Sequence, residues 1–100
     1  MKTIFKEENN DYVMYFEGRL DTAASPQVQQ EMQPLFENTE HNIILDCNNL
    51  DYISSSGLRI FLSILKSAKA NNCHVYIRNL SDGVRQIFTM TGFINLFEFK

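Results

Sequence analysis

The start of the chain has two apolar segments with a polar cluster between them. Two segments, 2–6 and 12–17, are rich in apolar and aromatic side chains, and the polar run from Glu7 to Asp11 separates them. Clusters of Asn, Asp and Glu between such segments are typical of turns. The pattern therefore predicts a β-hairpin whose second strand ends at Gly18.

A helical pattern follows from Pro26 to about Glu37. Its apolar residues recur at i, i+4, i+7 and i+8, which places them on one face of a helix; they are Val28, Met32, Leu35 and Phe36. Ser25 is expected to cap this helix, with Pro26 at the first helical position. Pro34 removes one intrahelical hydrogen bond, so a bend is expected in the last turns.

The middle of the chain predicts a strand, a loop and a second helix. The unbroken apolar run in 42–46 is typical of a strand that is covered on both faces. A serine-rich loop at 54–57 precedes a helical pattern that extends to about Ala70. Its apolar positions are Leu58, Phe61, Leu62, Leu65 and Ala68. Leu58, Leu62 and Leu65 are expected to face the sheet.

The last third predicts a strand at 73–78 and a helix capped by Ser81 and closed by Gly92, followed by a final strand or extended tail at 93–99. The order is β-β-α-β-α-β-α-β. We expect a single α/β domain spanning 1–100, with a mixed β-sheet backed by amphipathic helices. The connection between the strands at 42–46 and 73–78 is expected to be right-handed.

Composition narrows the function classes. The 100 residues are 44% hydrophobic and 21% charged, which is ordinary for one packed domain. The net charge of -3, with Lys and Arg scattered, gives no basic stripe for nucleic acid. No apolar stretch approaches the roughly 20 residues of a membrane span, so no membrane insertion is expected and a cytoplasmic location is predicted.

Cysteine and histidine placement favours no metal site and no cofactor. Cys47 and Cys73 lack the paired spacing of a zinc or redox site, and buried reduced thiols are expected. His41 and His74 flank separate strands with no ligating neighbour in sequence.

The serine cluster at 54–57 lies where a buried strand meets a helix start. A helix N-terminus has unpaired N–H groups and a partial positive charge, so it accepts an anion, but serine is also a common helix cap. Ser54, Ser55 or Ser56 can take either role. The segment lacks the first glycine of a G-x-S-x-G elbow, and the chain has no glycine-rich phosphate loop with Lys. No catalytic residue is assigned.

Three segments resemble the STAS domains of anti-sigma factor antagonists, and the resemblance covers nearly the whole chain. Gly18-Arg19-Leu20-Asp21 is similar to the family's G-x-[LI]-D turn. Ile53-Ser54-Ser55-Ser56-Gly57-Leu58 is similar to its phosphorylation loop, [IM]-[DS]-S-[ST]-G-[LV]. Segment 87–93, IFTMTGF, is similar to its helix-ending signature.

The resemblance implies that Ser55 is the phosphorylated residue, since it stands two positions before the glycine. Ser56 is then expected to cap the helix. Ser54 stands where many phosphorylated members carry Asp. The partner-binding residues are expected to be Asp21, Ser54, Ser56, Gly57 and Arg59, with Gly57 allowing close approach of a partner or phosphate. Asp21 and Asp46 are expected at strand ends near the loop, as turn residues or as an acidic rim.

The implied function is partner switching. The unmodified protein would bind an anti-sigma factor with serine kinase activity, phosphorylation of Ser55 would release it, and a metal-dependent serine phosphatase would restore it. This chain would be a bacterial regulator of transcription and not an enzyme. Two alternatives stay open: an unphosphorylated STAS scaffold in a signalling or lipid-transport assembly, and a small enzyme or nucleotide binder using the serine loop.

Overall fold

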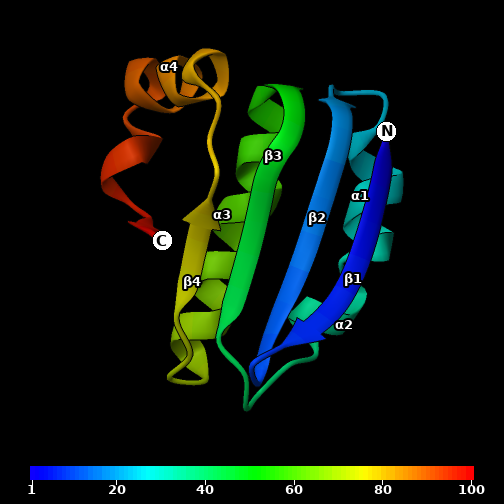
Figure 1. Ribbon diagram of the computed structural model, residues 1–100, viewed down its shortest axis with the longest axis vertical. Coiled ribbons are helices and arrows are strands. Elements are labelled where there is room, and N and C mark those ends of the chain that lie inside the picture. The colour runs from blue at the N-terminus through cyan, green and yellow to red at the C-terminus, as the bar shows by residue number, and fades with distance from the viewer.

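One five-stranded sheet organises the computed structural model, which describes all residues from 1 to 100 (Figure 1). The strands are β1 (Lys2–Glu8), β2 (Asp11–Leu20), β3 (Ile43–Ile53), β4 (Val75–Arg78) and β5 (Glu98–Phe99), and they lie in that order across the sheet. The pair β1 and β2 is antiparallel, whereas every other neighbouring pair is parallel. The predicted mixed sheet is confirmed.

The first two strands form the predicted hairpin. Asn9 and Asn10 both have positive φ, 50° and 70°, which matches the twist of a tight two-residue turn. The prediction that the second strand ends at Gly18 is wrong, because β2 continues to Leu20. Gly18 instead has φ of 104° beside a register shift against β3, a conformation that only glycine adopts easily.

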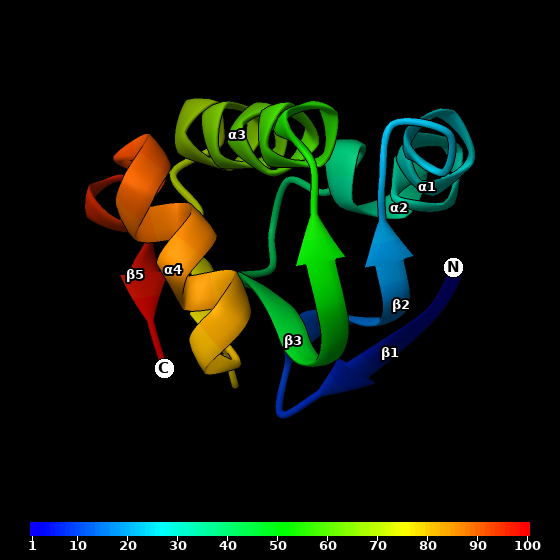
Figure 2. The ribbon, with the colours of Figure 1, turned by 90° about the horizontal axis from the view of Figure 1, so that it is seen from above.

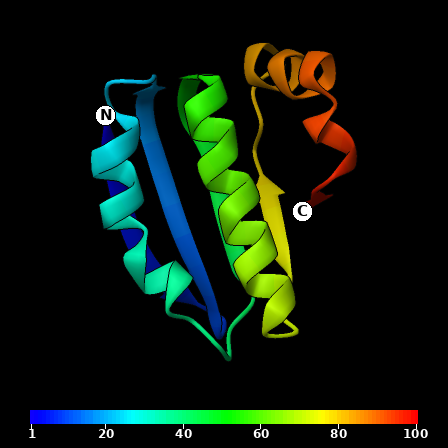
Figure 3. The ribbon, with the colours of Figure 1, turned by 180° about the vertical axis from the view of Figure 1, so that it is seen from behind.

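Helices cover one face of the sheet. These are α1 (Ser25–Glu31), α2 (Gln33–Phe36) and the long α3 (Ser55–Ala70), while α4 (Asp82–Thr91) lies beyond the end of β4 (Figure 3). The core between sheet and helices includes Phe16, Phe61 and Phe88. The ring centroid of Phe61 lies 5.2 Å from that of Phe16 and 6.4 Å from that of Phe88. All three side chains are fully buried.

The predicted helix from 26 to 37 is two helices. The helical path breaks at Met32, where ψ is 3°, two residues before Pro34. Pro34 has no N–H to continue the hydrogen-bond ladder, and its ring crowds the preceding turn. The bend predicted from Pro34 is therefore a break, after which α2 turns Leu35 into the core.

Leu62 is placed differently from the prediction. It is half-buried, whereas Leu58, Phe61 and Leu65 are buried. At about 100° per residue, a face centred on Phe61 and Ile64 leaves Leu62 at the margin of the helix–sheet contact. The face that α3 buries was predicted correctly at Leu58 and Leu65 and wrongly at Leu62.

The strand predicted at 42–46 continues to Ile53. The extension follows from pairing with β2, whose register runs from Tyr12 opposite Ile43 to Leu20 opposite Ile53. The expected final strand is mostly a turn of 3-10 helix, Phe93–Asn95, before the two residues of β5. The strand predicted at 73–78 begins at Val75.

Both cysteines are buried and unpaired, as predicted. Burial raises the pKa of the Cys47 thiol far above its ordinary value, since a thiolate would lie in an apolar interior. Among the helices, none has the length and apolar character that crossing a bilayer requires.

Candidate functional site

The serine loop, residues 54–57, lies where β2 and β3 end side by side. The prediction that all four residues form a loop is wrong, because residues 55–57 are the first three residues of α3. The Ser54 N–H donates to the Leu20 carbonyl across the two strands at 2.8 Å. Viewed from above, the ends of β2 and β3 stand beneath the first turns of α1 and α3 (Figure 2). The topology thus brings segment 18–21 beside the serine loop, as expected for Asp21.

Ser54 caps α3. Its backbone is extended, with φ of -85° and ψ of 171°, and its hydroxyl accepts a hydrogen bond from the Gly57 N–H at 3.2 Å. Its side chain is buried, with only 6% of the residue exposed. The expectation that Ser56 caps the helix is wrong, because the helix begins at Ser55, two residues earlier than a cap at Ser56 requires. Serine is among the best N-cap residues, and Ser54 caps α3 without adding a charge.

Ser55 and Ser56 are the first two residues of α3, and neither hydroxyl has a hydrogen-bond partner within the protein. Ser55 is exposed and Ser56 is half-buried. The three hydroxyls therefore differ in access: that of Ser54 is engaged and buried, that of Ser56 faces a groove, and that of Ser55 faces solvent.

Gly57 has a packing role that the sequence analysis missed. It is buried, and a Cβ built on it would lie 2.7 Å from Leu20 Cγ and 2.8 Å from Ile53 Cγ1. Glycine thus allows the start of α3 to rest directly on the ends of β2 and β3. Contact with a partner or a phosphate, the predicted role of Gly57, stays a prediction.

Asp21 caps the turn that leads into α1. Its Oδ1 accepts from the Ala24 N–H at 2.9 Å, and its carbonyl accepts from the Ser25 hydroxyl at 2.9 Å. Ser25 is consequently the first residue of α1 and not its cap, which corrects the prediction. The carboxylate holds the turn beside the serine loop, in agreement with the turn role considered for it.

Asp46 lies away from the loop, so its expected position at a strand end near the loop is wrong, and it cannot form an acidic rim there with Asp21. It is in the middle of β3, eight residues before Ser54, and it binds the Arg78 Nε at 2.7 Å. Arg78 also donates to the Tyr15 hydroxyl at 3.1 Å. A hydrogen bond from that hydroxyl to Glu8 raises the pKa of Tyr15, with some help from burial. These side chains link four strands on the sheet face opposite α3, and they contribute nothing to the serine loop.

A shallow groove of about 410 Å³ runs between α1 and α3 beside the serine loop. Five of the eight residues that line it have hydroxyl or amide side chains and one, Arg59, is charged: Thr22, Ser25, Pro26, Gln29, Ser56, Arg59, Ile60 and Ser63. Of the predicted partner-binding residues, Ser56 and Arg59 line this groove together. The α1 side of the groove was missed, because no local pattern in the sequence shows which helix lies next to α3.

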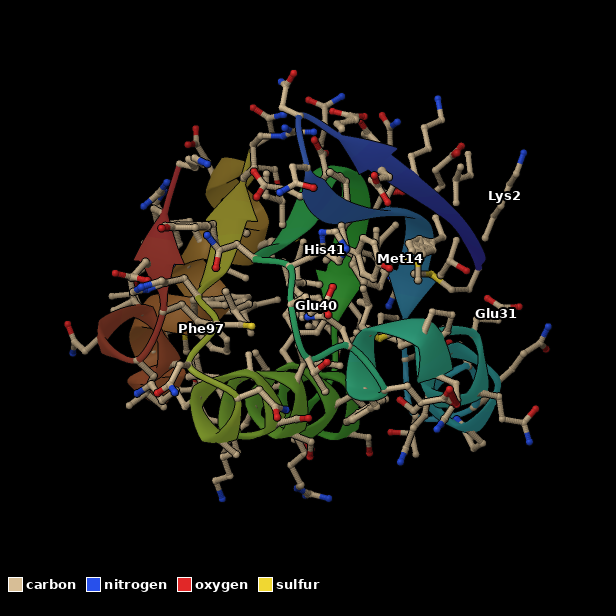
Figure 4. All side chains as sticks on the ribbon, turned by 90° about the horizontal axis from the view of Figure 1, so that it is seen from below. Lys2, Met14, Glu31, Glu40, His41 and Phe97 are labelled. Atoms are coloured by element: carbon tan, nitrogen blue, oxygen red, sulfur yellow. The ribbon has the colours of Figure 1, made fainter.

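Both histidines lie away from the serine loop: His41 precedes β3, and His74 precedes β4. His41 follows Glu40 in the connection between α2 and β3, seen from below in Figure 4, and its Nδ1 lies 2.8 Å from the Asn10 carbonyl. His74 pairs with Glu98 at 3.0 Å. No group of three or more His, Cys, Asp or Glu side chains is arranged to hold a metal ion.

Comparison with known proteins decides the family, since residues 2–100 match the profile of the STAS domain. The chain belongs to the STAS domain family. A curated STAS relative, the anti-sigma-B factor antagonist of Staphylococcus aureus, is 29% identical over 79 residues, covering 79% of this chain and 73% of its own. BtrV of Bordetella bronchiseptica, described as a candidate anti-sigma factor antagonist, is 28% identical over 97 residues, covering 97% of this chain and 84% of its own.

Solved structures confirm the STAS fold. The phosphorylated form of the Bacillus cell-fate determinant SpoIIAA superposes with a TM-score of 0.73 at 19% identity, covering 99% of this chain and 91% of that one. At this identity the likeness shows the fold alone. It agrees with the predicted single α/β domain and with its mixed sheet.

Proposed function

We propose that this protein is an anti-sigma factor antagonist that works by partner switching. The unmodified protein binds an anti-sigma factor with serine kinase activity and so frees a sigma factor. Phosphorylation of Ser55 ends that binding, and a metal-dependent serine phosphatase restores it. The observation that carries the proposal is the exposure of Ser55, the one loop hydroxyl that is both free of hydrogen bonds and open to solvent.

Two further findings support the proposal. The curated relatives are anti-sigma factor antagonists by name, and one solved structure with the same fold is that of SpoIIAA in its phosphorylated form. The groove beside Ser55 offers hydroxyls, an amide and a guanidinium, but neither an imidazole nor a carboxylate among its lining residues. Such a surface suits recognition of a protein partner better than acid–base chemistry.

The chemistry of the switch is transfer of one phosphoryl group. The Ser55 Oγ attacks the γ-phosphorus of ATP held by the kinase, the bond to the β-phosphate oxygen breaks, and ADP leaves while the hydroxyl proton passes to a base of the kinase. In the reverse reaction, a metal-activated water of the phosphatase breaks the P–O bond and releases inorganic phosphate.

Phosphate on Ser55 is expected to change docking more than folding. It adds about -1.5 to -2 charges at the first residue of α3, where the helix dipole favours an anion. When a partner surface without a matching cation covers the phosphate, the binding free energy becomes less favourable by several kcal/mol, because the charge is buried without a partner.

The test is incubation with an anti-sigma factor that has serine kinase activity, with magnesium and ATP, followed by mass spectrometric mapping. We expect phosphate on Ser55 in the wild type, and we expect Ser55→Ala to stay unlabelled while still binding the kinase. Thr89→Ala is the control, since Thr89 is an exposed hydroxyl residue on α4 outside the groove, and it should be labelled and bound like the wild type. Phosphate on Ser56 in place of Ser55 would shift the proposed site by one residue.

The second candidate function is an unphosphorylated STAS scaffold. It is favoured by Ser54, which lacks the negative charge that many phosphorylated family members carry next to the target serine. Stable kinase binding with no phosphate on any of the three loop serines would support the scaffold and contradict partner switching.

A further inference from the structure

Arg59 is the one arginine of this chain whose guanidinium has no partner within the protein. Arg19 and Arg85 lie over aromatic rings at 4.5 and 5.6 Å, and Arg78 pairs with Asp46 at 2.7 Å. No ion pair, side-chain hydrogen bond or ring contact involves the Arg59 guanidinium, and its side chain is exposed at the edge of the groove. This cation is therefore available to an anion.

Helix α3 is also cationic throughout, in a chain whose net charge is -3. Its charged residues are Arg59, Lys66 and Lys69, and it contains neither Asp nor Glu. Its first turn has no acid to complement the helix dipole, whereas α4 begins with Asp82. An anion at the start of α3 would meet both the dipole and the nearest of these cations.

The spacing brings Arg59 to Ser55. The two residues are four apart, and both are exposed on the same face of a regular helix. Side chains on an α-helix tilt toward its N-terminus, so the long Arg59 side chain, which lines the groove here, can also extend over the turn that begins with Ser55. A phosphate on Ser55 would lie within reach of its guanidinium.

No other charged group on the groove competes for this pairing. Across from α3, the groove is lined by Thr22, Ser25, Pro26 and Gln29, all uncharged. The nearest acid in the preceding turn, Asp21, already accepts a hydrogen bond from the Ala24 N–H.

We propose that a phosphate on Ser55 is bound by Arg59 of the same helix, and that this pairing withdraws the guanidinium from the partner-binding groove. The regulatory meaning of the pairing rests on the proposed function. In the unmodified protein, Arg59 is free to receive a carboxylate of the partner. In the phosphorylated protein, the phosphate adds negative charge to the surface. It also binds the Arg59 guanidinium through paired hydrogen bonds, so that this cation is no longer available to the partner.

The test measures the second pKa of the phosphate by ³¹P NMR. Phosphoserine is incorporated at position 55 during synthesis of the full chain, so no kinase is needed. We expect the pKa in the wild type to be about half a pH unit below that in Arg59→Gln, because a nearby cation favours the dianion. Arg85→Gln is the matched control, an exposed arginine on another helix, and it should give the wild-type value.

Arg59→Lys keeps the charge without the paired geometry and should give an intermediate pKa. The dipole of α3 acts equally in all variants, so it cannot produce the difference between them. Equal pKa values in the wild type and Arg59→Gln would overturn the inference. If the kinase labels Ser55 but this pKa difference is absent, the pairing alone fails; if the difference is present but no kinase modifies Ser55, the pairing stands and partner switching fails.

Discussion

Replacement of Gly57 by alanine tests whether the serine loop is held in place by direct contact between α3 and the sheet. The added Cβ would lie 2.7 Å from Leu20 Cγ and 2.8 Å from Ile53 Cγ1, well inside van der Waals contact. Leu20 and Ile53 are 0% and 1% exposed, so neither side chain has open space to move into. Overpacking of this kind typically costs about 1–3 kcal/mol.

The opposing effect is helix propensity, and the chain contains a control for it. Alanine is favoured over glycine inside a helix by about 0.8–1.0 kcal/mol. Gly83 is also in the first turn of a helix, but a Cβ built on it meets nothing within 4 Å. Gly83→Ala should therefore stabilise the protein slightly. Gly57→Ala gains the same helix propensity, but the steric clash of its Cβ outweighs that gain.

The assay is urea unfolding followed by circular dichroism, with the two alanine variants compared directly. Gly57→Ala should have a free energy of unfolding about 1–3 kcal/mol lower than that of Gly83→Ala. Values within about 0.5 kcal/mol of each other would show that the first turn of α3 can lift from the sheet without cost. The close contact would then not explain the glycine, and a role in partner contact would become the better account of it.

Three further predictions concern stability. Ser54→Ala should lower the free energy of unfolding by about 0.5–2 kcal/mol, because it removes the cap of α3, while Ser56→Ala should change it by less than about 0.5 kcal/mol; equal losses in urea unfolding would contradict the assigned cap. Phe61→Ala should cost about 3–5 kcal/mol and Leu62→Ala clearly less, since Phe61 is fully buried and Leu62 is at the margin; the reverse order would overturn the helix orientation. The raised pKa of Cys47 predicts a contribution to stability that is complete below the ordinary thiol pKa and is lost as the pH rises above it, because only the unfolded chain then releases the proton. In unfolding titrations at alkaline pH, Cys47→Ala should lose less stability than the wild type. An identical loss would refute this prediction.

Family motifs in the sequence indicated the two segments of the candidate site, because each segment is local in the chain, and the structure brings the two together. The turn at Gly18–Asp21 and the loop at 53–58 are each short segments with recognisable residue patterns. The hydrophobic periodicity of α3 and the β-branched runs of the strands predicted the alternation of elements and hence the sheet class. Such signals need no knowledge of distant neighbours.

Only the tertiary structure assigned the roles within the site. Ser54, Ser55 and Ser56 have the same side chain, and which of them caps α3 depends on where pairing with Leu20 ends the strand and lets the helix begin. The packing reason for Gly57 likewise depends on side chains that are far away in sequence.

The same distinction explains the errors of the sequence analysis. Asp46 was placed at a strand end because the apolar run stops there, but pairing with β2 continues β3 to Ile53 and leaves Asp46 to bind Arg78. The groove beside Ser55 exists because α1 lies next to α3, and no residue pattern within either helix predicts that the two are neighbours. Local propensities act over a few residues, whereas strand length, helix contacts and burial are set by the whole packed chain, where the larger share of the free energy lies.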